Sequence, residues 1–208
     1  MSDPSLTKAV VFVVDDDQAM RNSLKWLIES VGVQVESFAS ADEFLAQYQP
    51  GRAGCLVLDV RMPGMSGLDL QEYLLEKNIH IPVVIITGHG DVPMAVRAMK
   101  GGAIDFIEKP FNDEVLLDAI RRAIAYEEQQ RSQHVENLHI QERLSHLTPR
   151  EHEVMEMVTE GRSNKEIANA LGVSAKTIEA HRARVMEKMQ AGSLAELVRM
   201  VLAVNSHG

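Results

Sequence analysis

The feature that most constrains this fold is the alternation of short apolar segments with amphipathic helical patterns through the first 125 residues. Three of the segments are unbroken apolar runs, as in strands that are buried on both faces of a parallel sheet. Five strand–helix units predict a doubly wound α/β domain with a five-stranded parallel sheet, whose ligands bind at the carboxyl ends of the strands. The expected strands are 9–14, 33–38, 55–58, 83–87 and 104–108.

Residues 126–146 are polar and contain neither glycine nor proline. A flexible linker would be richer in glycine, serine or proline, so we expect a long solvated helix that continues the preceding one.

Residues 147–208 predict an all-α domain of four helices. Thr148, Ser163 and Ser193 are each followed three residues later by glutamate, as in a helical capping box. The Gly172-Val-Ser174 segment separates a short helix from a longer one over 175–189, which is the pattern of a helix-turn-helix. The expected domains are therefore 1–125, a helical linker 126–146, and 147–208.

Charge is unevenly distributed along the chain, whose formal net charge is −9. Residues 1–125 carry 11 Lys and Arg against 18 Asp and Glu, whereas residues 162–188 carry 6 against 3. Local potential governs nucleic-acid binding, so the second domain remains a candidate DNA binder. A single cysteine and the lack of a long apolar run favour a cytoplasmic protein without a disulfide framework or a membrane partner.

Carboxylates and two other polar groups gather at the predicted strand ends. Asp15 and Asp16 follow the first strand and Asp59 follows the third, while Thr87 and Lys109 end the fourth and fifth. Adjacent carboxylates repel each other unless a cation neutralises them, and a site with only oxygen ligands suits Mg²⁺. A hydroxyl and an ammonium beside them would bind the oxygens of a phosphoryl group on Asp59. The competing interpretation is that these acids are solvated loop caps.

Several motifs resemble the receiver domain of response regulators over residues 8–125. They are Val-Val-Asp15-Asp16, Leu-Asp59-Val-Arg-Met-Pro-Gly-Met-Ser-Gly, Thr87-Gly-His-Gly and Phe106-Ile-Glu-Lys109-Pro110-Phe. The resemblance implies that Asp59 is the phosphoacceptor for a sensor histidine kinase. It also implies that Mg²⁺ is bound by Asp15, Asp16, Asp59 and the carbonyl of Arg61. Thr87 and Phe106 would form a switch pair, although Phe106 also fits ordinary core packing, and Lys109-Pro110 is expected to be cis.

The expected helix over 175–189 has an apolar face and an opposite face with small alanines, which would let it enter the DNA major groove. Residues 147–202 resemble the LuxR-type helix-turn-helix, and with the receiver they resemble the NarL/FixJ family, the FixJ branch most of all. The resemblance implies base contacts by Glu179, Ala180 and Ala183. We expect phosphate contacts from Asn164, Lys165, Lys176, Thr177, Arg184 and Lys188. Arg182 lies nearer the inward face and is equally well a structural ion-pair partner, and His181 favours packing.

These observations favour a phosphorylation-switched transcription factor that activates promoters as a homodimer and acts with RNA polymerase. The family resemblance places the dimer surface on Val92, Ala95, Val96 and Met99. Two other classes stay open: a hydrolase that turns over an aspartyl phosphate, and a phosphorelay protein that never contacts DNA. Arg61 counts against the hydrolase, because haloacid-dehalogenase-type enzymes carry a second aspartate at that position. The bases of 162–188 count against the phosphorelay protein.

Overall fold

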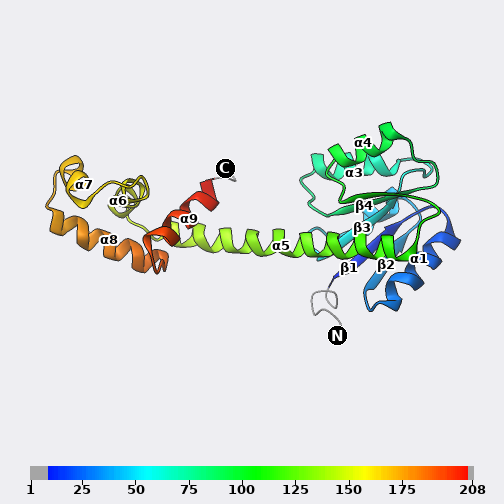
Figure 1. The fold of residues 1–208 in the computed structure, drawn as a ribbon, viewed down its shortest axis with the longest axis horizontal. Coiled ribbons are helices and arrows are strands. Elements are labelled where there is room, and N and C mark those ends of the chain that lie inside the picture. The colour runs from blue at the N-terminus through cyan, green and yellow to red at the C-terminus, as the bar shows by residue number, and fades with distance from the viewer. Residues whose placement is uncertain (1–8, 206–208) are drawn as a thin grey trace. The chain divides into compact units, whose positions relative to one another are not determined.

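The computed structural model describes residues 9–205 and forms two compact units, which divide between Gln130 and Arg131. The first unit is an α/β fold and the second is entirely helical (Figure 1). Each unit is described by itself below.

The first unit contains a five-stranded parallel sheet, as the sequence predicts, and its strands lie in the order β2-β1-β3-β4-β5. Its strands are β1 (Val10–Val14), β2 (Gln34–Phe38), β3 (Gly54–Asp59), β4 (Val83–Thr87) and β5 (Asp105–Glu108). No end of a predicted strand differs from these by more than one residue. One difference concerns the site, because Asp59 is the last residue of β3 and pairs in register with Ile86 of β4.

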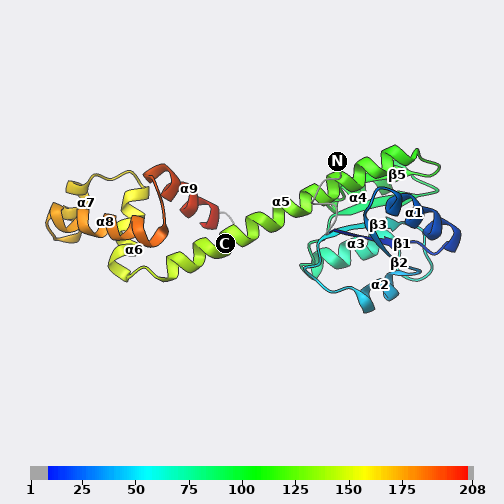
Figure 2. The same cartoon turned by 90° about the horizontal axis from the view of Figure 1, so that it is seen from below.

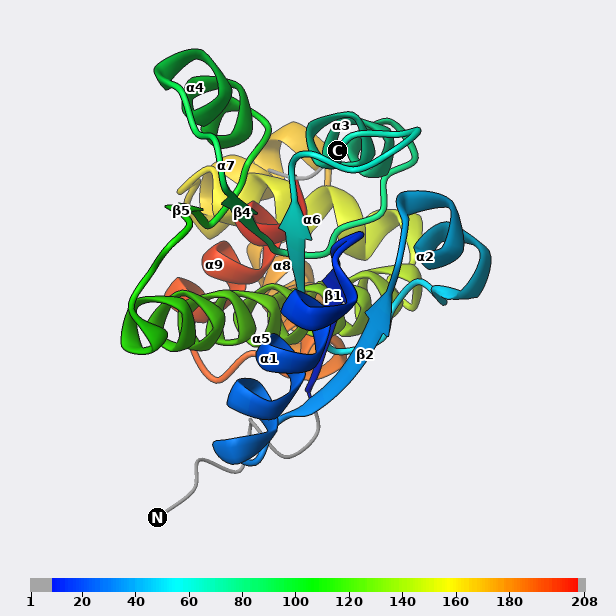
Figure 3. The same ribbon diagram turned by 90° about the vertical axis from the view of Figure 1, so that its right-hand side faces the viewer.

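Helices cover both faces of the sheet and bury a separate apolar cluster on each (Figure 3). α1 (Gln18–Ser30) and α5 (Asp113–Ser145) pack on one face, where Leu24, Ile28 and Ile120 are buried. α2 (Ala41–Gln47), α3 (Gly67–Glu76) and α4 (Val92–Lys100) pack on the other, around Phe44, Leu70 and Ala98. Strands β1, β3 and β4 are buried along their whole length, which explains their unbroken apolar sequences.

The polar segment after residue 125 is helical, as expected, because α5 continues without interruption to Ser145. Val135 and Leu138 on this segment are about half exposed. Ile140, by contrast, is 3% exposed and belongs to the core of the second unit together with Leu144. The core of the helix-turn-helix unit therefore begins before residue 147, inside the expected linker.

The second unit contains the C-terminal part of α5, followed by α6 (Pro149–Thr159), α7 (Asn164–Leu171), α8 (Ala175–Met189) and α9 (Leu194–Asn205) (Figure 2). Thr148 and Ser163 form complete capping boxes with Glu151 and Glu166. Ser193 forms only half of one, because the Glu196 carboxylate accepts from the backbone of Gly192. Ser40, before α2, likewise makes only one of the two capping-box hydrogen bonds. Its Oγ accepts the N–H of Glu43, but the Glu43 carboxylate accepts the N–H of Ala39 and not that of Ser40.

The turn of the helix-turn-helix depends on one glycine. Gly172 ends α7 in the left-handed region at φ +67°, which a residue without a side chain adopts without strain. Ser174 then caps α8 by accepting the N–H of Thr177.

Candidate functional site

The carboxyl ends of β1 and β3 bring two buried aspartates to one lysine. Lys109 Nζ donates to Asp15 Oδ2 at 2.7 Å and to Asp59 Oδ1 at 2.8 Å. Asp15 and Asp59 are 1% and 5% exposed, so these charges meet largely shielded from water. Lys109 follows β5 directly and reaches both partners across the edge of the sheet. The structure thus joins three of the predicted site residues.

Backbone groups hold the remaining carboxylate oxygens in place. Asp15 Oδ1 accepts from the N–H of Asp17, and Asp59 Oδ2 accepts from the N–H of Arg61 at 2.7 Å. Arg21 adds a contact that the sequence analysis missed. It is 8% exposed, and its Nη1 donates to the backbone carbonyl of Asp15 at 2.6 Å. The only sequence signal for it was an arginine one turn into the helix after the acidic segment.

The electrostatics of the cluster are asymmetric. Burial raises the pKa of the Asp59 carboxyl, and the contacts with Lys109 offset this only in part. Burial lowers the pKa of Lys109, but its bonds to Asp15 and Asp59 outweigh this, and the net pKa is raised. The two carboxylates stabilise the charged form of the ammonium by more than burial destabilises it. Lys109 is therefore charged at neutral pH.

The expected metal ligands are not all gathered by the structure. Asp16 is exposed, and within residues 9–205 no group of three acids, histidines or cysteines is arranged to hold a metal ion. Asp15 and Asp59 are nevertheless close enough to bind one cation together, because both contact the single ammonium of Lys109. Mg²⁺ needs only one or two carboxylates because it keeps several waters. The residues present therefore fit Mg²⁺. Asp15 and Asp59 would hold the ion, and the exposed Asp16 would approach it from the solvent side.

Thr87 and Phe106 lie close together beside this cluster. Thr87 is fully buried and its Oγ1 accepts from the N–H of His89 at 3.4 Å, while Phe106 is partly buried against the core. A Cβ at Gly90 would lie 3.1 Å from the Phe106 ring and 3.4 Å from the Thr87 methyl group. The Lys109-Pro110 peptide is cis, as the resemblance implied.

Helix α4 exposes most of its predicted dimer surface. Val92, Val96 and Met99 are 76%, 46% and 51% exposed, and Ala95 is partly buried. The helix is tied to α3 by Arg97, which binds the carboxylates of Asp69 and Glu72 at 2.7 Å. The aliphatic side chains of α4 are therefore exposed on a helix that ion pairs hold to α3.

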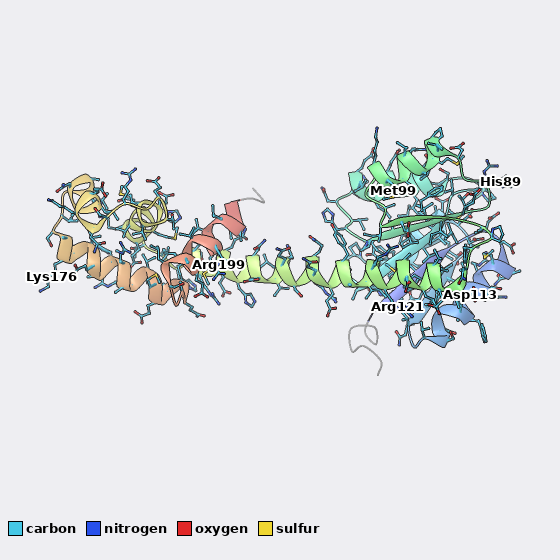
Figure 4. The ribbon with its side chains drawn as sticks, viewed as in Figure 1. His89, Met99, Asp113, Arg121, Lys176 and Arg199 are labelled. Atoms are coloured by element: carbon cyan, nitrogen blue, oxygen red, sulfur yellow. The ribbon has the colours of Figure 1, made fainter. Side chains whose placement is uncertain are left out.

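The exposed face of α8 carries most of the residues that the sequence assigned to DNA. Glu179, Ala180, Ala183 and Arg184 are exposed, as are Lys176 and Thr177 in the first turn. Lys176 projects from α8 away from α6 and α7 (Figure 4). Lys165 is exposed near the start of α7, and Asn164 beside it is partly buried. Ile178, Val185 and Met189 face the core, as predicted.

Lys188 differs from this expectation. Its Nζ donates to Glu151 Oε2 at 2.6 Å and to the carbonyl of His146 at 3.1 Å. Glu151 is 3% exposed, so Lys188 neutralises a buried acid, although its own side chain remains 34% exposed. We therefore remove it from the expected phosphate contacts. Arg182 likewise turns inward, as one of its two expected roles required, but its Nη1 donates to the neutral amide oxygen Oδ1 of Asn164 at 2.7 Å and not to the acid of an ion pair.

Known protein families account for both units. Residues 11–121 match the response regulator receiver domain, and residues 145–201 match the bacterial regulatory proteins of the luxR family. The chain is a two-component response regulator. Its LuxR-type domain is a DNA-binding domain, so it belongs to a family of transcription regulators, and the hydrolase alternative is set aside.

The response regulator is similar to other regulators over nearly its whole length. It is 50% identical to Nodulation protein W of Bradyrhizobium diazoefficiens, over 93% of this chain and 86% of that protein. It is 47% identical to the transcriptional regulatory protein FixJ of Azorhizobium caulinodans, over 92% of this chain and 91% of that one.

Two solved structures resemble the full response regulator. The response regulator StyR matches with a TM-score of 0.81 at 46% identity, covering 93% of this chain and 98% of that one. Full-length FixJ from B. japonicum matches with a TM-score of 0.58 at 45% identity, covering 96% and 98%. Within the described part of the response regulator, no helix is long and apolar enough to cross a membrane.

Proposed function

We propose that a sensor histidine kinase phosphorylates Asp59, and that the phosphorylated protein dimerises and activates transcription from its promoters with RNA polymerase. The observation that carries this proposal is the Lys109 ammonium placed 2.8 Å from Asp59 Oδ1 at the carboxyl end of β3. A nucleophilic carboxylate with a fixed cation beside it is the arrangement that phosphoryl transfer needs.

In the transfer step, an Asp59 oxygen forms a bond to phosphorus while the phosphorus–nitrogen bond of the kinase's phosphohistidine breaks and the imidazole nitrogen keeps the electron pair. Lys109 balances charge beside the new phosphoryl group, and the Thr87 hydroxyl would bind one of its oxygens. Mg²⁺, held by Asp15, Asp16, Asp59 and the Arg61 carbonyl, would supply further charge neutralisation.

The phosphoryl group would draw the Thr87 hydroxyl toward Asp59 and let the adjacent Phe106 ring turn inward. Since Phe106 lies in β5, next to α4, this movement would alter the face of Val92, Ala95, Val96 and Met99. We propose that two such faces pair in the dimer, because exposed aliphatic side chains gain free energy when they are buried.

In the DNA complex, Glu179, Ala180 and Ala183 would meet base edges in the major groove. Lys165, Lys176, Thr177, Arg184 and Asn164 would contact phosphates, while Lys188 stays paired with Glu151.

The proposal is tested by treating the full chain with acetyl phosphate and Mg²⁺ and locating the adduct by mass spectrometry after borohydride trapping. We expect the label on Asp59 alone, and no label in Asp59→Asn. Duplex binding is then measured with and without the phosphodonor. Labelling of another aspartate, or undiminished labelling of the variant, would refute the assignment.

A further inference from the structure

A hydrogen bond joins the two helices of the helix-turn-helix at the edge of the expected DNA surface. Arg182, in the middle of α8, donates from Nη1 to Oδ1 of Asn164, the first residue of α7, at 2.7 Å. Both side chains are partly buried. Within residues 9–205, Asn164 Nδ2 has no hydrogen-bond partner and is not buried, so its two N–H groups are open to solvent.

We infer that Arg182 is a positioning residue for DNA binding, which orients Asn164 so that its Nδ2 group donates to a backbone phosphate. The inference rests on the proposed DNA interface and adds a role to a residue outside it. A side-chain amide has an accepting end and a donating end, and phosphate oxygens only accept. An amide held by its oxygen therefore turns toward DNA the end that DNA can use.

The chemistry of the pair makes this orientation stable. Turning the amide over would place its NH₂ group against the guanidinium, so that two donors would face each other without an acceptor. The guanidinium is planar and permanently charged, and a hydrogen bond from it is stronger than one between neutral groups. Arg182 thus stabilises the orientation of the Asn164 amide in which Oδ1 accepts its hydrogen bond.

The competing role for Arg182 is a direct contact with a phosphate. Its neighbour Arg184 is exposed on the same helix and provides the matched comparison, because we expect that arginine to meet DNA directly. A direct cationic contact releases counterions, whereas a positioning residue does not. The two roles therefore differ in the salt dependence of binding as well as in its strength.

The test is a double-mutant cycle with the full chain and a 30-base-pair duplex of arbitrary sequence, since phosphate contacts act on all sequences. Wild type, Arg182→Met, Asn164→Ala and the double variant are titrated at several salt concentrations, with and without acetyl phosphate and Mg²⁺. We expect each single variant to weaken binding by about three- to tenfold. The double variant should bind no more weakly than Asn164→Ala alone, because the arginine acts through the asparagine.

The second readout is the salt slope, which is the change in the logarithm of the binding constant with the logarithm of the salt concentration. We expect Arg182→Met to leave it unchanged, whereas Arg184→Met should reduce it by about one ion. Asn164→Asp keeps the acceptor for Arg182 but loses the donors, so it should bind at least as weakly as Asn164→Ala. Arg182→Lys, which keeps a donor and a charge, should recover part of the affinity and guards against a variant that fails to fold.

Three outcomes would overturn the inference. One is additive losses with a reduced slope in Arg182→Met, which would make Arg182 a direct phosphate contact. Another is a loss for Asn164→Ala with none for Arg182→Met, which would show that Asn164 needs no orientation. The third is full binding by Asn164→Asp. If the wild-type chain binds no duplex under either condition, the proposed function fails first, and that result is distinct from these three.

Discussion

Replacing Lys188 with methionine should destabilise the helix-turn-helix unit while leaving the receiver unaffected. The substitution leaves the Glu151 carboxylate, 3% exposed, without its cation. In the native protein the bond from Lys188, together with those from the Thr148 cap, lowers the pKa of Glu151 from 4.5 to about 2. At about 1.4 kcal/mol for each pKa unit, that shift sets an upper bound of roughly 3 kcal/mol. The Lys188 side chain is 34% exposed, and solvent screening reduces the expected loss to about 1–2 kcal/mol.

The chain offers an internal control for this measurement. Its single tryptophan, Trp26, lies in α1 of the receiver, so tryptophan fluorescence follows only that unit during thermal unfolding. Far-ultraviolet circular dichroism follows the helices of both units. We expect the melting temperature of the second unit to fall by about 4–8 °C for each kcal/mol lost, with the fluorescence transition unchanged.

The dependence on pH follows from the direction of the shift. Because the folded pKa of Glu151 is depressed, its stabilising contribution is complete above the unfolded value near 4.5 and disappears as the pH falls toward about 2. Lys188→Met should remove the part of this dependence that comes from the Lys188 bond and leave the part that comes from the Thr148 cap. Melting of that unit in Lys188→Met at the wild-type temperature would show that Lys188 does not stabilise Glu151. A salt slope for DNA binding that fell by about one ion would instead return Lys188 to the phosphate contacts.

Three further predictions concern the receiver. Gly67→Ala should destabilise it by about 1–3 kcal/mol in chemical unfolding, because a Cβ there would lie 2.1 Å from the carbonyl oxygen of Asp59. Gly88→Ala, whose Cβ would meet nothing within 4 Å, is the matched control and should be nearly neutral. Lys109→Met should tighten Mg²⁺ binding in calorimetry, since two carboxylates lose the ammonium that competes with the metal; weaker binding would contradict this. Val96→Arg should prevent phosphate-dependent dimers in light scattering, and their persistence would place the dimer surface elsewhere.

The sequence predicted the architecture well because its signals lie within single elements. Unbroken apolar runs identified β1, β3 and β4, and the glycine at 172 marked the turn of the helix-turn-helix. The long α5 followed from a polar segment without helix breakers. The meeting of Asp15, Asp59 and Lys109 was also predictable, because parallel strands end at one edge of their sheet.

Partnerships between distant side chains could not be read in the same way. Lys188 has the charge and helical position of a DNA contact, and Arg182 lies nearer the inward face, but the sequence did not show which residue of another segment binds each of them. The burial of Arg21 beneath Asp15 and of Ile140 in the second core also left little trace in the local pattern. In each case the sequence supplied the right residue type but not its partner.

The sequence by itself thus determined which elements form, where they are capped, and which edge of the sheet collects the acidic groups. Those outcomes depend on periodicity and on contacts between near neighbours, which the order of residues specifies directly. Only the tertiary structure decided which cations remain exposed and which neutralise or orient a buried partner. The reason is that Glu151 and Lys188 lie 37 residues apart, and their pairing depends on how α6 packs against α8.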